Sequence, residues 1–193
     1  MDCYMEMINK IKQNLAREME EQRYQHTLRV MKIAVELARE NNVSQKKAKV
    51  AALLHDYTKN WEIDKIKKLV KASCWQIDQL EYSIDKVLHA PASACIARKK
   101  YNISDFQILE AIRYHTIGNP NMGKLSYIIF AADIIEPGRN FPGVDNIRNE
   151  IHHNFKNGIK LICEQSIKYN IKKNRLIHPG TLKLRNSLLE GNN

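Results

Sequence analysis

The sequence predicts an all-α fold, a single compact multi-helix domain that covers residues 1–193. Only 7 glycines and 5 prolines occur in 193 residues, too few for the many tight turns of an all-β architecture. Apolar residues recur at helical spacing nearly throughout, and no segment alternates convincingly as a strand. One hydrophobic core is sufficient at this length, and no internal repeat or long linker divides the chain.

The first helices are expected at 2–19, 24–40 and 44–57, with another after Asn60. The second carries an apolar stripe, Val30, Ile33 and Leu37, that begins at His26. Ser44 is suited to cap the third. Residues 50–54 are almost continuously apolar, which predicts that this helix is central and buried.

Capping residues mark two further helix starts. Ser73 with Gln76, and Ser104 with Gln107, have the spacing of a capping box, in which the two side chains satisfy backbone amides reciprocally. We therefore expect a helix to begin at each serine.

The remaining elements follow from proline, glycine and apolar spacing. Pro91 suits the first turn of a helix that continues to about Lys100, with His89 just before it. The loop at 136–143 is the strongest turn signal, because prolines and glycines cluster there. Helices are also expected at 121–135, 145–154 and 155–174, and a short one after 178–180.

The chain is basic, with a formal net charge of +10. Residues 151–185 hold eight lysines and arginines but only one acid, Glu164. This excess favours polyanionic partners such as nucleotides, nucleic acid or an acidic surface. A solvated basic face explains most of these lysines equally well, so charge alone does not choose a function.

The sequence indicates a cytoplasmic protein. No apolar run approaches the ~20 residues that a membrane-spanning helix needs, and the N-terminus lacks the pattern of a signal peptide. The four cysteines are dispersed, without a CxxC pair. We expect them to be reduced thiols without a function.

Four of the expected helices place a histidine or an aspartate on the face that should be buried. These residues are His26, His55 with the adjacent Asp56, His115 and Asp133. A single buried histidine is more often a hydrogen-bonded core residue, and a buried unpaired aspartate costs several kcal/mol. Four such helices together favour a metal site, for which imidazole and carboxylate ligands suit Fe, Mn, Co, Ni or Zn.

The order His26, His55-Asp56, Asp133 resembles the H…HD…D signature of the HD-domain phosphohydrolases, an all-α superfamily whose four signature residues bind a metal. Further blocks resemble the YqeK family over nearly the whole chain. They are Q-H-T-L-R-V at 25–30, L-H-D-Y-T-K at 54–59, L-H-A-P at 88–91, Y-H-T at 114–116, A-D-I-I-E-P-G-R at 132–139 and I-H-P at 177–179, with Thr181 and Arg185-Asn186.

The resemblance implies an HD-type domain that cleaves diadenosine tetraphosphate symmetrically into two ADP, with its metal site between core helices. It implies a divalent metal centre of dinuclear iron, with Mn, Co, Ni or Mg as alternatives. His26, His55, Asp56 and Asp133 would bind one metal. Asp56, as the catalytic bridging residue, would reach a second metal held by His89 and His115 and activate water for attack on a β-phosphorus.

The resemblance also implies substrate contacts. Lys59, close after His55-Asp56, is expected to stabilise charge on the phosphates, and Arg139 to clamp one of them. His89, His115 and Thr116 are expected near the substrate, and Thr181 and Arg185 by resemblance only. Taken alone, Lys59 is equally a solvated helix end and Arg139 a loop cation. Arg29 is a weaker candidate, His152-His153 reads as a surface pair, and His178 as a turn residue.

Other functions stay open at this point. The H…HD…D core is equally compatible with hydrolysis of a dNTP, a cyclic nucleotide or a guanosine alarmone. A basic, non-catalytic module for nucleic acid is disfavoured, because 151–185 offers only Phe155 and Tyr169 for stacking. A structural metal domain without catalysis is a third reading. We expect a small-molecule nucleotide as the partner, no membrane and no nucleic acid, and leave a homodimer open.

Overall fold

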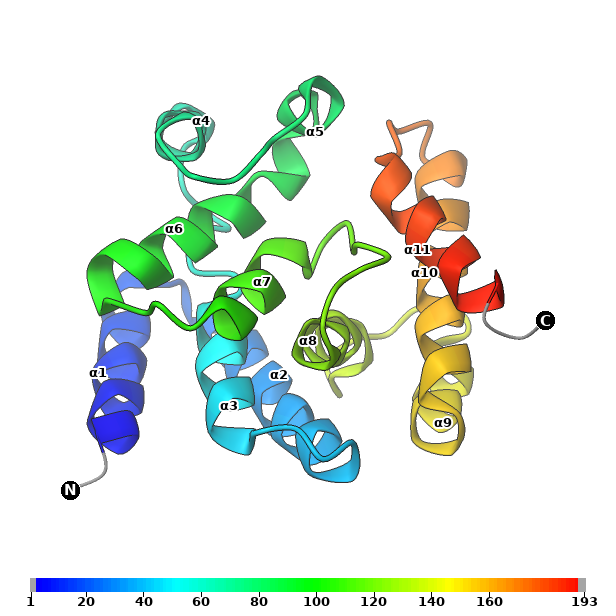
Figure 1. The fold of residues 1–193 in the computed structure, drawn as a ribbon, viewed down its shortest axis with the longest axis horizontal. Coiled ribbons are helices and arrows are strands. Elements are labelled where there is room, and N and C mark those ends of the chain that lie inside the picture. The colour runs from blue at the N-terminus through cyan, green and yellow to red at the C-terminus, as the bar shows by residue number, and fades with distance from the viewer. Residues whose placement is uncertain (1–2, 191–193) are drawn as a thin grey trace.

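The computed structural model describes residues 3–190, and within this range it contains helices and no strand (Figure 1). The predicted helix start at Asp2 lies outside the described residues. None of the described helices is long and apolar enough to cross a membrane. The elements are α1 (Cys3–Glu18), α2 (Glu21–Glu40), α3 (Gln45–Leu54), α4 (Ile63–Lys71), α5 (Gln79–Ser83), the 3₁₀ turn η1 (Asp85–Val87), α6 (His89–Tyr101), α7 (Phe106–Tyr114), α8 (Lys124–Ile135), α9 (Val144–His153), α10 (Phe155–Lys172) and α11 (Pro179–Glu190).

The centre of the fold is α3, which contacts α1, α2, α6, α7 and α8. Residues 50–54 are fully buried, as their continuous apolar character predicts. Ala48 is buried as well, and together with Ala51 and Ala52 its small side chain lets neighbouring backbones approach closely. Burying one large aliphatic side chain stabilises a fold by roughly 1.5–3 kcal/mol, and one apolar cluster extends from Ile8 to Leu188.

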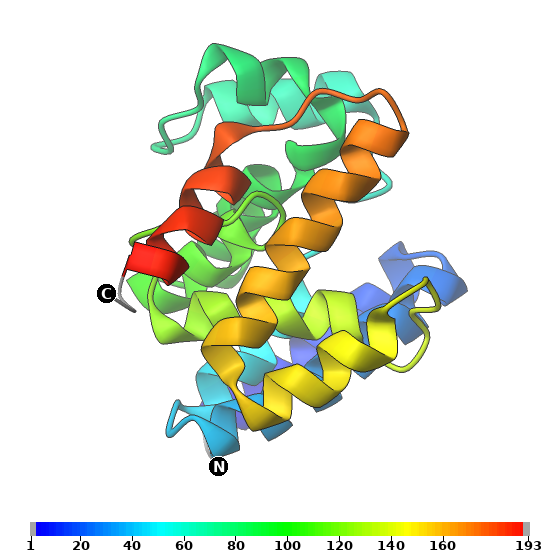
Figure 2. The ribbon, with the colours of Figure 1, turned by 90° about the vertical axis from the view of Figure 1, so that its right-hand side faces the viewer.

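Two groups of helices flank this centre. Helices α9 and α11 both pack on α10, and the three form the right-hand side of Figure 1, while Figure 2 shows α10 running beside α11. On the upper side, α4 packs on α6 through a smaller apolar cluster of Ile66, Val70, Leu88 and Ala92.

The predicted helix at 44–57 is shorter in the structure. Ser44 caps it as expected, accepting a hydrogen bond from the Lys47 amide at 3.4 Å. It ends at Leu54, and residues 55–60 form successive turns. Thr58 fixes these turns to α6, because its amide donates to Ser93 Oγ and its hydroxyl donates to the His89 carbonyl.

The helix predicted to start at Ser73 is absent, and that prediction is wrong. Ser73 Oγ accepts from the amide of Trp75, two residues on. The next helix, α5, begins at Gln79 because Asp78 caps it, accepting from the Glu81 amide at 2.7 Å. Aspartate also replaces the predicted serine as the cap of α7, where Asp105 accepts from the amides of the second and third helical residues.

Other boundaries also differ from prediction, and α2 begins at Glu21, three residues before the expected start. His89 is the first residue of α6 and does not precede it. The helix expected from 121 begins at Lys124, because Glu110 accepts from the Gly123 amide and the Ser126 hydroxyl and holds the preceding turn.

A buried ion pair attaches α5 to α7. Arg113 donates from Nη2 to Glu81 Oε2 at 2.6 Å, and both side chains are only 3% exposed. Arg113 also donates to the Gln76 carbonyl at 3.4 Å. Removing one partner of such a pair leaves an uncompensated charge in the interior.

We therefore expect Arg113→Met to lower the free energy of unfolding by about 3–5 kcal/mol. The double variant Arg113→Met/Glu81→Leu should recover most of this loss, because no buried charge remains unpaired. Urea denaturation followed by circular dichroism measures both. A loss below ~1 kcal/mol in Arg113→Met would mean that solvent already compensates this pair.

Candidate metal centre

The structure brings together all six residues predicted to bind metal. His26 lies on α2, His55 and Asp56 in the turn after α3, His89 at the start of α6, His115 directly after α7, and Asp133 on α8. The four histidines and Asp56 are buried, whereas the Asp133 side chain is 15% exposed. Three overlapping groups have ligand atoms within 4.8 Å of one another: His26 with His55 and Asp56, His55 with His115 and Asp133, and Asp56 with His89 and His115.

Asp56 lies in the middle of this cluster, and its two carboxylate oxygens face different histidines. Oδ1 is 2.9 Å from His89 Nε2 and 3.4 Å from His115 Nε2. Oδ2 is 3.6 Å from His55 Nε2 and 3.7 Å from His26 Nε2. At the His26 end, His26 Nε2 is also 3.1 Å from Asp133 Oδ1. One carboxylate therefore connects two groups of nitrogen ligands.

Each imidazole is oriented by a hydrogen bond from its Nδ1. His55 Nδ1 lies 2.6 Å from the Ala52 carbonyl, His89 Nδ1 2.8 Å from that of Lys86, and His115 Nδ1 2.8 Å from that of Ile112. A carbonyl oxygen only accepts, so these partners assign the proton to Nδ1 and leave the Nε2 lone pair facing the cluster.

Burial keeps the His55 and His89 rings neutral. It lowers the pKa of His55 to about 3 and that of His89 to about 4. Burial alone would raise the pKa of Asp56 and Asp133, but the neighbouring imidazoles, and for Asp133 also Arg139, outweigh it and lower both values well below the usual range. Neutral imidazoles and ionised carboxylates are the protonation states that bind metal.

This arrangement of donor atoms favours a bound cation. His89 Nε2 and His115 Nε2 are 3.1 Å apart, so two lone pairs face each other beside a carboxylate. The Nε2 atoms of His26 and His55 are buried without a hydrogen-bond partner. Buried polar groups in folded proteins normally have a partner. A divalent metal satisfies all of these atoms, and the mixed nitrogen and oxygen donor set fits one.

Glu136, to which the sequence assigned no role, orients the remaining imidazole. Glu136 Oε1 is 3.0 Å from His26 Nδ1, and its carboxylate also accepts from Arg29 Nε at 2.5 Å and from the Gly138 amide at 2.6 Å. A carboxylate on the far nitrogen of a ligand histidine fixes the ring and increases its basicity. Its position one helical turn after Asp133 is the signal that could have revealed it.

Two arginines contact the carboxylates of the cluster. Arg139, a predicted residue, donates from Nε to the Asp133 carbonyl at 2.7 Å and from Nη2 to Asp133 Oδ1. Arg23 donates to Asp56 Oδ2 at 2.8 Å, and the sequence did not indicate it. Arg23 lies three residues before His26 on the same helix, a spacing that places both on one face.

Lys59 lies beside His89, where its Nζ is 3.3 Å from both ring nitrogens. Burial lowers its pKa. The structure thus brings this predicted residue to the cluster of histidines, and the lysine is not a solvated helix end.

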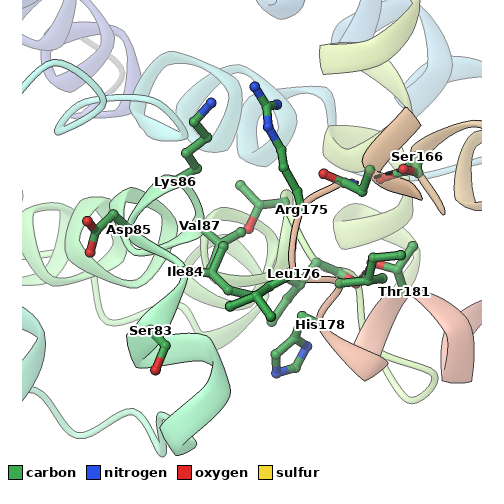
Figure 3. Close-up of a pocket in the computed structure, with 14 residues that line it drawn as sticks. Ser83, Ile84, Asp85, Lys86, Val87, Ser166, Arg175, Leu176, His178 and Thr181 are labelled. Atoms are coloured by element: carbon green, nitrogen blue, oxygen red, sulfur yellow. Dashed lines mark hydrogen bonds between the residues drawn. The ribbon is translucent and has the colours of Figure 1, made fainter. Parts of the chain in front are cut away.

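Thr116, the residue after His115, lines a pocket with a volume of about 280 Å³. Its hydroxyl is buried without a hydrogen-bond partner. We call this cavity the apolar pocket, because Ile84, Val87, Ile117, Leu176 and Ile177 line it, and Figure 3 shows Lys86 and Arg175 pointing to the same side of it. Thr181 lines it too, and donates to the Ile117 carbonyl.

The other histidines and Arg185 lie outside the cluster. His152 is exposed and lies 3.0 Å from a carboxylate oxygen of Glu40, and His153 is exposed, as expected of a surface pair. His178 lines the apolar pocket, where its Nε2 is 2.9 Å from Asp78 Oδ2 and its Nδ1 accepts from the Gly180 amide. Arg185 donates to Glu164 and does not line the pocket.

Comparisons with known proteins agree with this geometry. Residues 23–138 match the family described as HD domain. The chain is 42% identical over 169 residues to the symmetrical bis(5'-nucleosyl)-tetraphosphatase of Halalkalibacterium halodurans, covering 88% of this chain and 90% of that protein. It is 34% identical to the Bacillus subtilis protein of the same name, covering 90% and 93% of the two chains.

A solved structure shares the fold. It is the crystal structure of a protein from Clostridium acetobutylicum described as a predicted HD superfamily hydrolase involved in NAD metabolism, with a TM-score of 0.91, 35% identity and coverage of 95% and 97% of the two chains. The chain therefore belongs to the HD-domain family and, within it, to the group that includes these symmetrical tetraphosphatases.

Proposed function

We propose that this protein is a metal-dependent phosphohydrolase that cleaves diadenosine tetraphosphate and related dinucleoside polyphosphates symmetrically, producing two ADP. The observation that carries the proposal is the cluster of inward-facing imidazole nitrogens around the Asp56 carboxylate, which fits divalent metal. The names of the relatives from H. halodurans and B. subtilis support the choice of substrate.

For the metal we propose a dinuclear centre. His26, His55, Asp56 and Asp133 would hold one ion, and Asp56, His89 and His115 the other. The different partners of Asp56 Oδ1 and Oδ2 support this division. We propose iron, with Mn, Co, Ni or Mg as alternatives, since this donor set accepts several metals. Metals bound there polarise phosphoryl oxygens and lower the pKa of water.

The protein side chains supply the rest of the reaction. The bond that breaks joins the two middle phosphates, and its bridging oxygen leaves with one ADP while water adds to the other. Lys59, beside His89, and Arg139, beside Asp133, are placed to neutralise charge on the phosphates. The apolar pocket next to His115 is suited to one nucleoside, with the buried Thr116 hydroxyl available to it.

Three broader properties belong to the same proposal. A single domain is supported by the apolar cluster that extends from Ile8 to Leu188. A cytoplasmic location is supported by Cys74, Cys95 and Cys163, which form no disulfide. The substrate is a small nucleotide, and a panel with dNTPs, cyclic nucleotides and guanosine alarmones tests the other HD reactions.

Replacing Asp56 by Ala should remove the connection between both ligand groups. We expect turnover to fall by at least about 10³-fold, since metal centres contribute several kcal/mol to such reactions, and metal content to fall with it. Circular dichroism should show that the helices persist. His152→Ala, at the exposed surface pair, is the matched control, and wild-type turnover and metal content in Asp56→Ala would refute the site.

Incubation with diadenosine tetraphosphate should produce ADP as the only nucleotide, in protein that carries about two metal ions per chain. Chromatography of the products and elemental analysis measure the two quantities. AMP with ATP would mean asymmetric cleavage. Metal without any turnover would contradict the proposed substrate but would still support the proposed metal site.

The lowered pKa values of His55 and His89 also predict acid sensitivity. Their neutral forms are favoured only in the folded state, so the stability they confer is present above pH ~6.5 and is lost as the pH falls towards the folded-state values of about 3 and about 4.

Denaturation of the chelator-treated protein between pH 7 and pH 4 measures this loss. Near pH 5, protonation of His55 and His89 should change the free energy of unfolding by about 2.7 kcal/mol per pH unit. His55→Leu should reduce this slope by about 1.4 kcal/mol per pH unit. His152→Leu is the exposed control. An unchanged slope in His55→Leu would mean that His55 titrates normally in the folded protein.

A further inference from the structure

A second cavity, also of about 280 Å³, opens at the His26 end of the cluster. Three arginines line it, Arg23, Arg29 and Arg139, and we call it the arginine pocket. The described residues that complete its lining are Glu20, Gln22, His26, Asn60, Glu136 and Gly138, so no aliphatic side chain faces it.

The two pockets adjoin different residues of the proposed ligand cluster. Ring centroids of neighbouring imidazoles are 5.7 Å apart for His26 and His55, 4.9 Å for His55 and His115, and 5.1 Å for His115 and His89. His26 lines the arginine pocket. The apolar pocket includes Lys86, whose carbonyl accepts from His89, and Thr116, which follows His115.

We propose that the arginine pocket binds the second ADP half of the substrate, and that it does so through the phosphates and ribose without selecting the base. The inference rests on the proposed function and adds a second nucleotide site to it. Symmetrical cleavage requires the middle of the tetraphosphate at the metal ligands, so one ADP must extend to each side. Two cavities of similar volume, one lined by His26 and the other by the residue after His115, provide these two places.

The linings explain why the two sites differ in selectivity. Aliphatic side chains in the apolar pocket favour a purine over a pyrimidine, because the purine has the larger ring face. Guanidinium groups bind phosphate oxygens in pairs and stack on any base, so they contribute affinity without reading its edge.

Arg29 is the diagnostic residue of this pocket. Arg23 and Arg139 donate to proposed metal ligands, whereas Arg29 donates to Glu136. Gly138 makes room for it, since a β-carbon at that position would lie 2.5 Å from Arg29 Nη2. The Glu136 carboxylate thus holds the guanidinium at the pocket, and Gly138 leaves space for it because glycine has no side chain. The remaining N–H donors of the guanidinium are available to phosphate.

The direct test is calorimetric titration of the metal-loaded protein with ADP. We expect two ADP per chain in the wild type and weakening of one site by about tenfold in Arg29→Met, as for loss of one charge-assisted hydrogen bond. Arg98→Met, an exposed arginine that lines neither pocket, should bind as the wild type does. A single ADP per chain in the wild type overturns the inference.

Kinetics separate substrate binding from a structural effect through Glu136. Arg29→Met should raise KM for diadenosine tetraphosphate about tenfold while kcat stays within about twofold and metal content is unchanged; Arg29→Lys should be intermediate. A fall in kcat together with loss of metal would show that Arg29 only holds Glu136 and His26, and overturns the inference. Two ADP sites without hydrolysis of the tetraphosphate would instead overturn the proposed function and leave the second nucleotide site standing.

Mixed substrates test the lack of base selectivity. Adenosine-tetraphospho-uridine can place its adenine in the apolar pocket and its uracil in the arginine pocket. Its kcat/KM should be within about threefold of the diadenosine compound, whereas diuridine tetraphosphate should be at least about tenfold poorer, since small changes in apolar contact have effects of this size. A mixed substrate as poor as diuridine tetraphosphate would overturn base-independent binding.

Discussion

The carboxylate of Asp56 imposes the main constraint on this structure. It is buried and ionised, and four buried imidazoles turn their Nε2 atoms towards the cluster around it. An isolated carboxylate in the interior would be protonated or would oppose folding. Here it is tolerated because separate elements of the chain each deliver one partner to the same place. The packing of α2, α3, α7 and α8 on one another is what keeps those partners together.

A second constraint concerns how two adjacent residues both reach the cluster. In a continuous helix, neighbouring side chains diverge by about 100°, so His55 and Asp56 would not both face inward with ideal geometry. The helix instead ends at Leu54, and the following turns, held to α6 by Thr58, redirect the chain. The end of α3 is therefore a functional feature of the fold, although it looks like a premature stop in a good helical sequence.

Most of the helices, and all six proposed metal ligands, could be predicted from the sequence, because each ligand interrupts or ends an apolar stripe or lies in a recognisable motif. Boundaries at Ser73 and His89 could not, since competing caps and turns decide them locally. The roles of Arg23 and Glu136 were missed for a different reason. Their spacing from His26 and Asp133 places them near the cluster, but their partners, Asp56 and His26, are 33 and 110 residues away in the chain, so that spacing alone does not identify the contacts they make.

Lys86 connects the proposed metal centre to the apolar pocket through two contacts. Its carbonyl accepts the Nδ1 hydrogen of His89, and the same residue lines the cavity. A molecule that shifts the short η1 segment on entering the cavity therefore also changes the orientation of a ligand imidazole. Because coupling between two binding events is reciprocal, the affinity for metal and the affinity for a nucleoside are linked quantities. The nucleotide affinity would then depend on the metal occupancy at which it is measured, even where the fold is unchanged.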